Sequence, residues 1–339
     1  MRVLPKIVSL VPKRFEDGAW SGEPRFDFEL RQVFPGMQSL RLALEPRWTL
    51  RRILALRDPG VVAIVGSEDS VFLPSHVRTI VVHHGCAQTH FDRDPQWRGL
   101  LPRWRCLAQR LMYRRPNRTY IALARWTAQQ FSGHYGVPEA TVIPSWVSPL
   151  PRRDARRGPP VILGDWRTFN KGREVIPRLR QCLPDVEFRP LVCTYATRAA
   201  AYAAADAYLC LSLSEGGSFS ASDAEAAALP LITTDVGNCL EYNESRIFPW
   251  QSRDDVTYVA DTIGRALAVP RGPVFFARWT FEEWRRAWQD LVCRVADSPP
   301  SAALLPRRAG GSPGAPGLPR PVPAAIRGQS GAAAAPAAR

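Results

Sequence analysis

Short apolar runs alternate with helical patterns along the first half of the chain. The runs lie at 6–12, 61–66, 79–85 and 119–124, and the helical patterns lie at 24–33, 48–57, 98–113 and 126–134. The runs lack the polar alternation of a strand with one wet face, which favours parallel strands that are covered on both faces. The pattern predicts a first α/β domain over residues 1–145.

The second half of the chain alternates more regularly. Strands are predicted at 161–164, 186–192, 207–213, 230–234 and 246–248, with helices at 172–182, 196–204 and 219–228 between them. This alternation predicts a doubly wound parallel sheet over residues 161–275. Residues 146–160, between the two domains, are proline-rich and charged, as is typical of a linker.

Two further segments follow the second domain. Residues 276–296 contain an amphipathic helix with one apolar stripe, formed by Trp284, Trp288, Leu291 and Val295. Residues 297–339 are rich in Pro, Ala and Gly and show no periodicity, so we expect them to be disordered. A length of 339 residues and a hydrophobic fraction of 45% suit two globular domains.

The sequence favours a cytoplasmic protein. No window approaches the roughly 20 apolar residues of a spanning helix. The N-terminal residues are better interpreted as a first strand than as a secretion signal. The seven cysteines are scattered and form no CxxC pair. Buried free thiols in a reducing compartment are the simplest interpretation.

The net charge of +14 indicates anionic partners. Only Lys6, Lys13 and Lys171 are lysines, and the other basic residues are arginines, a bias that base composition of the genome would also produce. No nucleic-acid-binding module is present, so a nucleic acid partner is not expected. Residues 98–118 interleave arginines with Leu, Trp and Met, which allows peripheral contact with an anionic membrane. An ordinary surface helix is the alternative.

The stretch LSLSEGGSFSASDAEAAALPLITTDVG, residues 211–237, has the pattern of a ligand site. Glu215 follows a predicted strand, where ligands bind in doubly wound sheets. Gly216 and Gly217 permit close backbone approach. Ser218 or Ser220 can cap the next helix, whose N-terminus would then face an anion.

The spacing of the acids separates their roles. Asp223 and Glu225 are two residues apart, about 200° around a helix, so they cannot face the same site. Glu215 and Asp223 remain as candidates. Carboxylates suit sugar hydroxyls better than phosphates, because hydroxyls donate hydrogen bonds. A helix cap with solvated acids is the alternative interpretation.

These residues resemble the E-x7-E region of retaining GT-B glycosyltransferases, especially glycosyltransferase family 4. The first acid of the motif is Glu215, and Asp223 stands where the family usually has a second glutamate. VILGDWRTFNKGREVI resembles the strand and loop that carry the two diphosphate-binding cations. Lys171 matches one cation directly, and Arg167 is displaced by one position from the other.

The resemblance extends to the first domain. VVHHGCAQTH resembles the family's strand that ends in His-Gly, where a histidine faces the donor sugar. His84 is the better match, and His83 is the competitor. Residues 16–26, with Gly18 and Gly22, are the candidate for the family's glycine-rich loop.

The resemblance implies two Rossmann-like domains that face a cleft and transfer of a sugar from a nucleotide-diphosphate sugar, such as a UDP- or GDP-sugar, with retention and no cofactor. The terminal helix would pack back towards the N-terminal, acceptor-side domain. The acceptor would be an unidentified glycan, lipid or protein. The implied catalytic residues are Glu215, His84, Lys171 and Arg167, and the implied donor-binding residues are Asp223, Gly216, Gly217, Ser218 and Phe219.

A metal site and two other functions are the alternatives. His83, His84, Cys86 and His90 are metal-binding residue types, but their spacing matches no familiar zinc pattern. No metal is therefore expected. A nucleotide-sugar epimerase of the same fold and a non-catalytic nucleotide-sugar-binding protein remain open.

Overall fold

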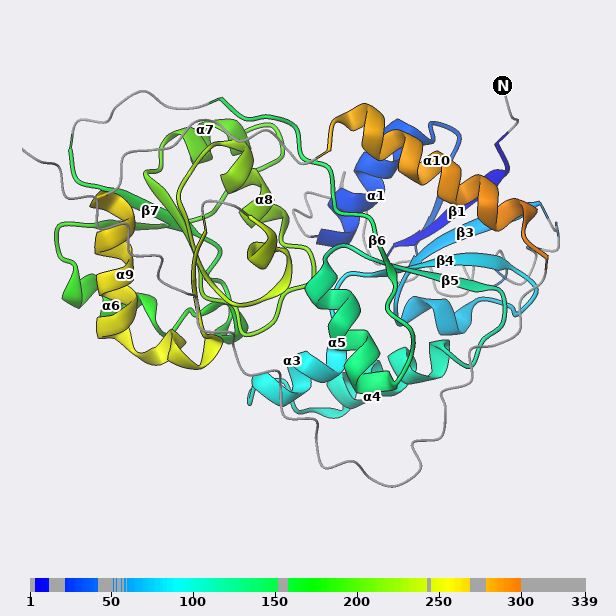
Figure 1. Cartoon of the computed structure of the whole chain (residues 1–339), viewed down its shortest axis with the longest axis horizontal. Helices are drawn as coiled ribbons and strands as arrows, with labels where there is room; N and C mark the ends of the chain where they lie inside the picture. Colours follow the sequence, from blue (N-terminus) through cyan, green and yellow to red (C-terminus); the bar gives the residue numbers. More distant parts are fainter. Residues whose placement is uncertain are drawn as a thin grey trace, which may run out of the picture. The chain divides into compact units, whose positions relative to one another are not determined.

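Two parallel β-sheets form the framework of the chain (Figure 1). The computed structural model describes residues 4–11, 22–41, 51, 53, 56, 58, 60–151, 158–242, 245–268 and 279–299. Gly18, most of the predicted helix at 48–57 and residues 300–339 of the predicted disordered tail lie outside these ranges. The predicted α/β fold with two parallel-sheet domains is confirmed.

The N-terminal sheet has the strand order β2-β1-β3-β4-β5-β6, and every neighbouring pair is parallel. Its strands are β1 (Lys6–Val11), β2 (Gln38–Arg41), β3 (Val61–Gly66), β4 (Arg78–His83), β5 (Arg118–Ala122) and β6 (Thr141–Val142). All six residues of β3 are buried. This burial on both faces explains why the sequence VVAIVG has no polar alternation.

Successive residues of β3 enter two different cores. Val62 and Ile64 pack with the helices of one face, and Ala63 and Val65 pack with those of the other. The helices are α1 (Gly22–Val33) and α10 (Phe281–Asp297) on the first face, and α4 (Leu100–Met112) and α5 (Arg125–Tyr135) on the second.

Helix α10 packs on β3, β4 and α1 of the N-terminal sheet (Figure 1). Thr280 and Glu283 form a capping box at its start, which satisfies two backbone N–H groups of the first turn. Trp284 and Trp288 are fully buried, and their rings meet Phe26 of α1 edge-on. The apolar stripe identified in the sequence is thus the buried face of α10.

The C-terminal sheet has the order β11-β10-β9-β7-β8 and is also parallel. Its strands are β7 (Val161–Gly164), β8 (Glu187–Pro190), β9 (Ala207–Cys210), β10 (Leu231–Thr234) and β11 (Ser245–Phe248). Helices α6 (Ile176–Cys182) and α9 (Val256–Ala268) cover one face, and α7 (Arg198–Ala203) and α8 (Phe219–Ala226) cover the other.

Several boundaries differ from the prediction. The helix predicted at 172–182 begins only at Ile176, because Phe169–Lys171 form a 3₁₀ turn that Gly172 closes with φ 82°. The pattern does not predict the short edge strands β2 and β6, helix α3 (Ala87–Arg93) or helix α9. Strands of two to four residues are too short to show a period.

The two sheets belong to one compact unit and contact each other directly. Arg93 Nη1 donates a hydrogen bond of 3.0 Å to the Leu213 carbonyl. Thr127 Oγ1 donates one of 3.0 Å to the Gly216 carbonyl. These bonds hold the loop that follows β9 against the N-terminal domain.

Candidate active site

A cavity of about 570 Å³ lies where the loop after β9 meets the carboxyl ends of the N-terminal strands. This is the position in which open α/β sheets bind their ligands. The C-terminal sheet contributes Asn170, Lys171, Ser214, Glu215, Gly216 and Gly217; the N-terminal sheet and its helices contribute Gly22, Glu23, Glu68, His84, Cys86, His90, Trp97, Arg105 and Gln109, among others.

Lys171 and Glu215 form an ion pair on the cavity wall. Ser212 Oγ donates a hydrogen bond of 2.7 Å to Glu215 Oε1 and fixes the carboxylate. Burial alone would lower the pKa of Lys171, but the negative charges of Glu215 and Asp165 outweigh it and hold that pKa above its usual value. Lys171 therefore stays protonated and can bind an anionic group in the cavity.

The loops that carry this pair are joined to each other. The Leu213 N–H donates to the Asn170 carbonyl at 2.9 Å, and Asn170 Nδ2 donates to the Ser214 carbonyl at 3.3 Å. A Cβ atom at Gly172 would lie 2.5 Å from the Leu211 Cβ atom. Only glycine therefore allows this left-handed turn to pass so close to the end of β9.

Gly216 and Gly217 let the loop after β9 touch the N-terminal domain. A Cβ atom at Gly216 would lie 1.6 Å from the His84 carbonyl oxygen, and one at Gly217 would lie 2.8 Å from the Leu123 Cβ atom. In this structure the close approach that the two glycines allow is to the N-terminal domain, and their approach to a ligand stays a prediction. The same contact brings Glu215 and His84 to one cavity.

The structure places His84, and not His83, on the cavity. The His84 ring lies edge-on to Phe26 at 5.1 Å, and burial lowers its pKa to about 4, so its imidazole is neutral at pH 7. His83 is fully buried, stacks on Phe131 at 3.7 Å and is hydrogen-bonded to Tyr113. Successive strand residues point to opposite faces, which separates the two histidines.

The N-terminal domain adds two acids, Glu23 and Glu68, to the cavity wall. Glu68 forms an ion pair with Arg105 and accepts a hydrogen bond of 3.1 Å from Gln109. Burial, and then the charges of Glu68 and Asp69, raise the pKa of Glu23 to about 8. Glu23 therefore carries a proton at neutral pH and can donate a hydrogen bond into the cavity.

Asp223 does not line the cavity. Its side chain is fully buried, and the two Arg25 guanidinium nitrogens bind its two oxygens at 2.6 and 3.0 Å. Arg198 Nε lies 3.6 Å from the same carboxylate, and Glu29 accepts a further hydrogen bond from Arg25. Phe219 covers this cluster, with its ring 4.5 Å from the Arg25 Cζ atom. Both Asp223 oxygens are therefore bound by protein side chains in this arrangement and are not available to a ligand.

Two other predicted site residues lie apart from the cavity wall. Ser218 caps α8 by accepting the Ala221 N–H, and its own N–H donates to Asn238 Oδ1 at 2.8 Å. The Arg167 side chain is 61% exposed and is paired with Asp165 at 2.6 Å. Lys171 is therefore the predicted cation that the structure brings to the cavity.

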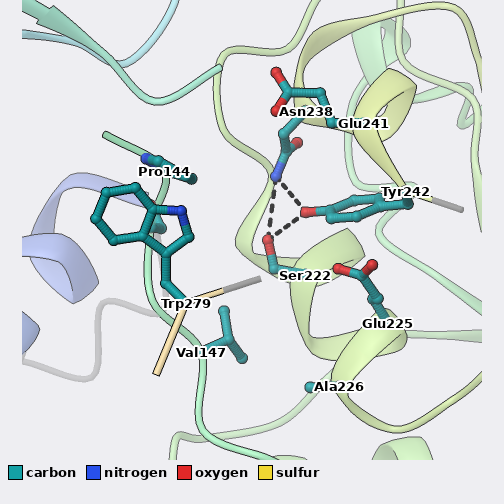
Figure 2. Close-up of a pocket in the computed structure, with 10 residues that line it drawn as sticks. Pro144, Val147, Ser222, Glu225, Ala226, Asn238, Glu241, Tyr242 and Trp279 are labelled. Atoms are coloured by element: carbon teal, nitrogen blue, oxygen red, sulfur yellow. Dashed lines mark hydrogen bonds between the residues drawn. The ribbon is translucent and has the colours of Figure 1, made fainter. Parts of the chain in front are cut away.

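Glu225 lines a separate small pocket, as its position on the helix predicts (Figure 2). Three polar side chains on one wall of the pocket are hydrogen-bonded to one another. Tyr242 Oη lies 2.6 Å from Ser222 Oγ and 2.5 Å from Asn238 Nδ2. Trp279 lies across the pocket from them (Figure 2). Helix α8 thus keeps Asp223 and Glu225 in different environments.

Residues that sequence reasoning missed complete the site. Glu68 and Arg105 face the cavity, and Arg25 engages Asp223. Glu68 had a usable signal, because it follows a buried strand by two residues and so lies at a carboxyl end. Arg25 had none, since its partner is 198 residues away. Among the described residues, no group of three or more His, Cys, Asp or Glu could hold a metal ion.

Comparisons with known proteins agree with this architecture. Residues 13–149 match the model of Glycosyltransferase Family 4. A search of curated protein sequences gives no match.

Solved structures share the fold at low sequence identity. Sucrose-phosphate synthase from Thermosynechococcus elongatus has a TM-score of 0.61 at 14% identity, over 86% of this chain and 96% of that one. HepE from Anabaena, solved with UDP-glucose, has a TM-score of 0.58 at 11% identity, over 86% and 97%. Together with the two parallel sheets, these matches show that the chain has the GT-B fold and that residues 13–149 are similar to Glycosyltransferase Family 4.

Proposed function

We propose that the chain transfers a sugar from a nucleotide-diphosphate sugar to an acceptor, with retention, and that the cavity is the site of transfer. One observation carries the proposal: Lys171, Glu215 and His84 line a single cavity to which both sheets contribute. A departing diphosphate requires positive charge, and sugar hydroxyls require fixed hydrogen-bond partners. The cavity offers both.

Lys171 would stabilise the departing diphosphate. When the bond from the sugar to the diphosphate breaks, the electron pair stays on the phosphate oxygen, and a fixed cation lowers the energy of that charge. Arg167 would be the second cation. Its ion pair with Asp165 is exposed, and such pairs are worth no more than about 1 kcal/mol, so the side chain can turn to a ligand at little cost. Lys171 and a reoriented Arg167 would together supply this charge without a metal.

The sugar would be held between the two domains. Glu215 would accept hydrogen bonds from sugar hydroxyls, which would loosen its ion pair with Lys171. His84 is neutral and can donate one hydrogen bond and accept another. Backbone N–H groups of the Gly216–Phe219 turn would add further contacts, except that of Ser218, which Asn238 occupies.

We propose that Asp223 binds the ribose only after Arg25 releases it. Arg25 belongs to α1 of the N-terminal domain, whereas Asp223 belongs to α8 of the C-terminal domain. Separation of the domains would remove Arg25 from both carboxylate oxygens and leave Arg198 of the C-terminal domain 3.6 Å from one of them. Hinge motions of this kind are common in two-domain folds. The C-terminal domain would then carry the nucleotide and the N-terminal domain the acceptor. HepE, solved with UDP-glucose, supports a donor of this class.

The bond between Arg25 and Asp223 also favours a second candidate, a non-catalytic nucleotide-sugar-binding protein. Both Asp223 oxygens are engaged by Arg25, so the motif acid is held in a structural role. Such a protein would bind the donor and release no nucleotide.

A thermal-shift screen against UDP, GDP, ADP and their sugars tests donor binding. A ligand that binds only the folded chain raises Tm, by an amount that grows with its concentration relative to Kd. We expect at least one nucleotide series to raise Tm in the wild type and to lose most of this effect in Lys171→Ala. Lys6→Ala is the matched control, because Lys6 is exposed at the start of β1. An absence of any shift would contradict the proposal.

A further inference from the structure

Helix α4 presents large apolar side chains to solvent. Leu100 is 86% exposed, Leu101 69%, Trp104 43% and Leu107 47%. At about 100° per residue, Leu100, Trp104 and Leu107 fall within roughly 60° of one another on the helix. They form one continuous apolar stripe, and such stripes are uncommon on the surfaces of soluble proteins.

Positive charge flanks this stripe. Arg103 and Arg110 are exposed and lie on the side of the helix next to Leu107. Helix α4, with the sequence LLPRWRCLAQRLM, contains no acidic residue. In the part of the chain that the structure describes, neither arginine has an ion-pair partner, whereas Arg105 on the opposite side is bound by Glu68.

The opposite side of α4 belongs to the cavity. Arg105 and Gln109 line it, and Gln109 also donates a hydrogen bond of 3.0 Å to the Gly85 carbonyl beside His84. Trp97, three residues before Leu100, lines the cavity as well. The buried side of α4 is thus anchored to the site, and its apolar, basic side is left for another partner.

We propose that this face, defined by Leu100, Arg103, Trp104, Leu107 and Arg110, docks on an anionic lipid surface. Amphipathic helices bind such surfaces by burying apolar side chains among the headgroups while basic side chains meet the lipid charge. A second copy of the chain fits the face poorly, because its own arginines would be brought together. The proposed contact uses one exposed face of a helix and is therefore peripheral. No helix in the described ranges is long and apolar enough to cross a membrane.

Co-sedimentation of the full chain with vesicles tests the proposal. We expect binding to vesicles that contain phosphatidylglycerol, little binding to pure phosphatidylcholine, and weakening at high salt. The double variant Arg103→Glu/Arg110→Glu should lower the partition coefficient at least about thirtyfold. Leu100→Gln/Leu107→Gln should lower it at least about tenfold. Both pairs are exposed, and circular dichroism melting checks that the variants fold.

Matched changes elsewhere on the surface separate a docking face from general basicity. Arg178→Glu/Arg246→Glu makes the same change in charge on exposed positions of the C-terminal domain. Val192→Gln alters an apolar residue that is 83% exposed. Both controls should bind nearly as the wild type does. Equal losses in the controls, equal binding to both kinds of vesicle, or no binding at low salt would overturn the proposal. None of these readings depends on the donor or on catalysis.

Discussion

Among single residues, two pairs that lie close together in the sequence point into different environments in the structure. His83 and His84 separate because a strand alternates its faces, and strand periodicity reduces the choice to one of the pair. Asp223 and Glu225 separate because a helix turns by about 200° over two residues. The partner of Asp223 could not be predicted, because its bond with Arg25 depends on how two distant segments meet.

The bond between Arg25 and Asp223 makes a prediction about stability. Arg25→Met would leave the buried Asp223 carboxylate with only Arg198, at 3.6 Å. Breaking a buried ion pair on one side typically costs about 3–5 kcal/mol. Urea unfolding should show a loss of this size, and Arg25→Met/Asp223→Leu should recover most of it.

An exposed pair provides the comparison. Arg265 and Asp261 lie on the surface of α9, both more than half exposed. Arg265→Ala should change the free energy of unfolding by less than about 1 kcal/mol. A loss in Arg25→Met as small as this would show that the buried pair adds nothing to stability.

Glu23 makes a prediction about pH. Its pKa rises from 4.5 to about 8 in the folded chain. The folded chain then keeps a proton that the unfolded chain loses, so this residue makes stability fall as pH rises from 4.5 to 8, and adds no further change above 8. The free energy of unfolding of Glu23→Gln, relative to that of the wild type, should therefore rise by up to about 1.4 kcal/mol per pH unit in this window.

Urea midpoints measured across the same window check the sign. Glu139→Gln, on the exposed surface, is the matched control. A difference between Glu23→Gln and the wild type that stays constant with pH, or that shrinks as pH rises, would rule out a protonated Glu23 in the folded chain.

At the scale of elements, the long periodic segments were predictable and the turns were not. The Trp-rich stripe of α10 predicts a buried face because four large apolar residues recur at helical spacing. The start of α6 could not be read in the same way, since it depends on Gly172 at φ 82°. The 3₁₀ turn that replaces the first helical turn is what places Lys171 beside Glu215.

Gly216 and Gly264 give opposite predictions for the same substitution. Gly216→Ala would place a Cβ atom 1.6 Å from the His84 carbonyl oxygen, so the loop after β9 must move. We expect a cost of about 1–3 kcal/mol. Gly264 lies within α9, and a Cβ atom added there would meet nothing within 4 Å, so Gly264→Ala should stabilise the chain by about 0.5–1 kcal/mol. Thermal melting of both variants measures the difference, and equal Tm values would contradict the contact at Gly216.

At the scale of the whole molecule, two parallel sheets follow from buried apolar runs in strand–helix order. The packing of the two sheets against each other does not follow from the sequence pattern. It depends on individual side chains that recur at no regular spacing. Arg93 donates a hydrogen bond to the Leu213 carbonyl, and its Cζ atom lies 4.7 Å from the centre of the Trp250 ring. Arg25 forms an ion pair with Asp223. The cavity that results combines predicted residues, such as Glu215 and Lys171, with acids that the sequence pattern did not single out.

Release of nucleoside diphosphate from a nucleotide sugar is the decisive measurement for transfer from this cavity. We expect the wild type to release nucleotide from at least one donor. Lys171→Ala should release it about 10²–10³-fold more slowly, the usual effect of removing one fixed group that stabilises a developing negative charge. Lys6→Ala should match the wild type. Donor binding without release, or release that is equally fast in Lys171→Ala, would contradict sugar transfer with Lys171 stabilising the leaving diphosphate.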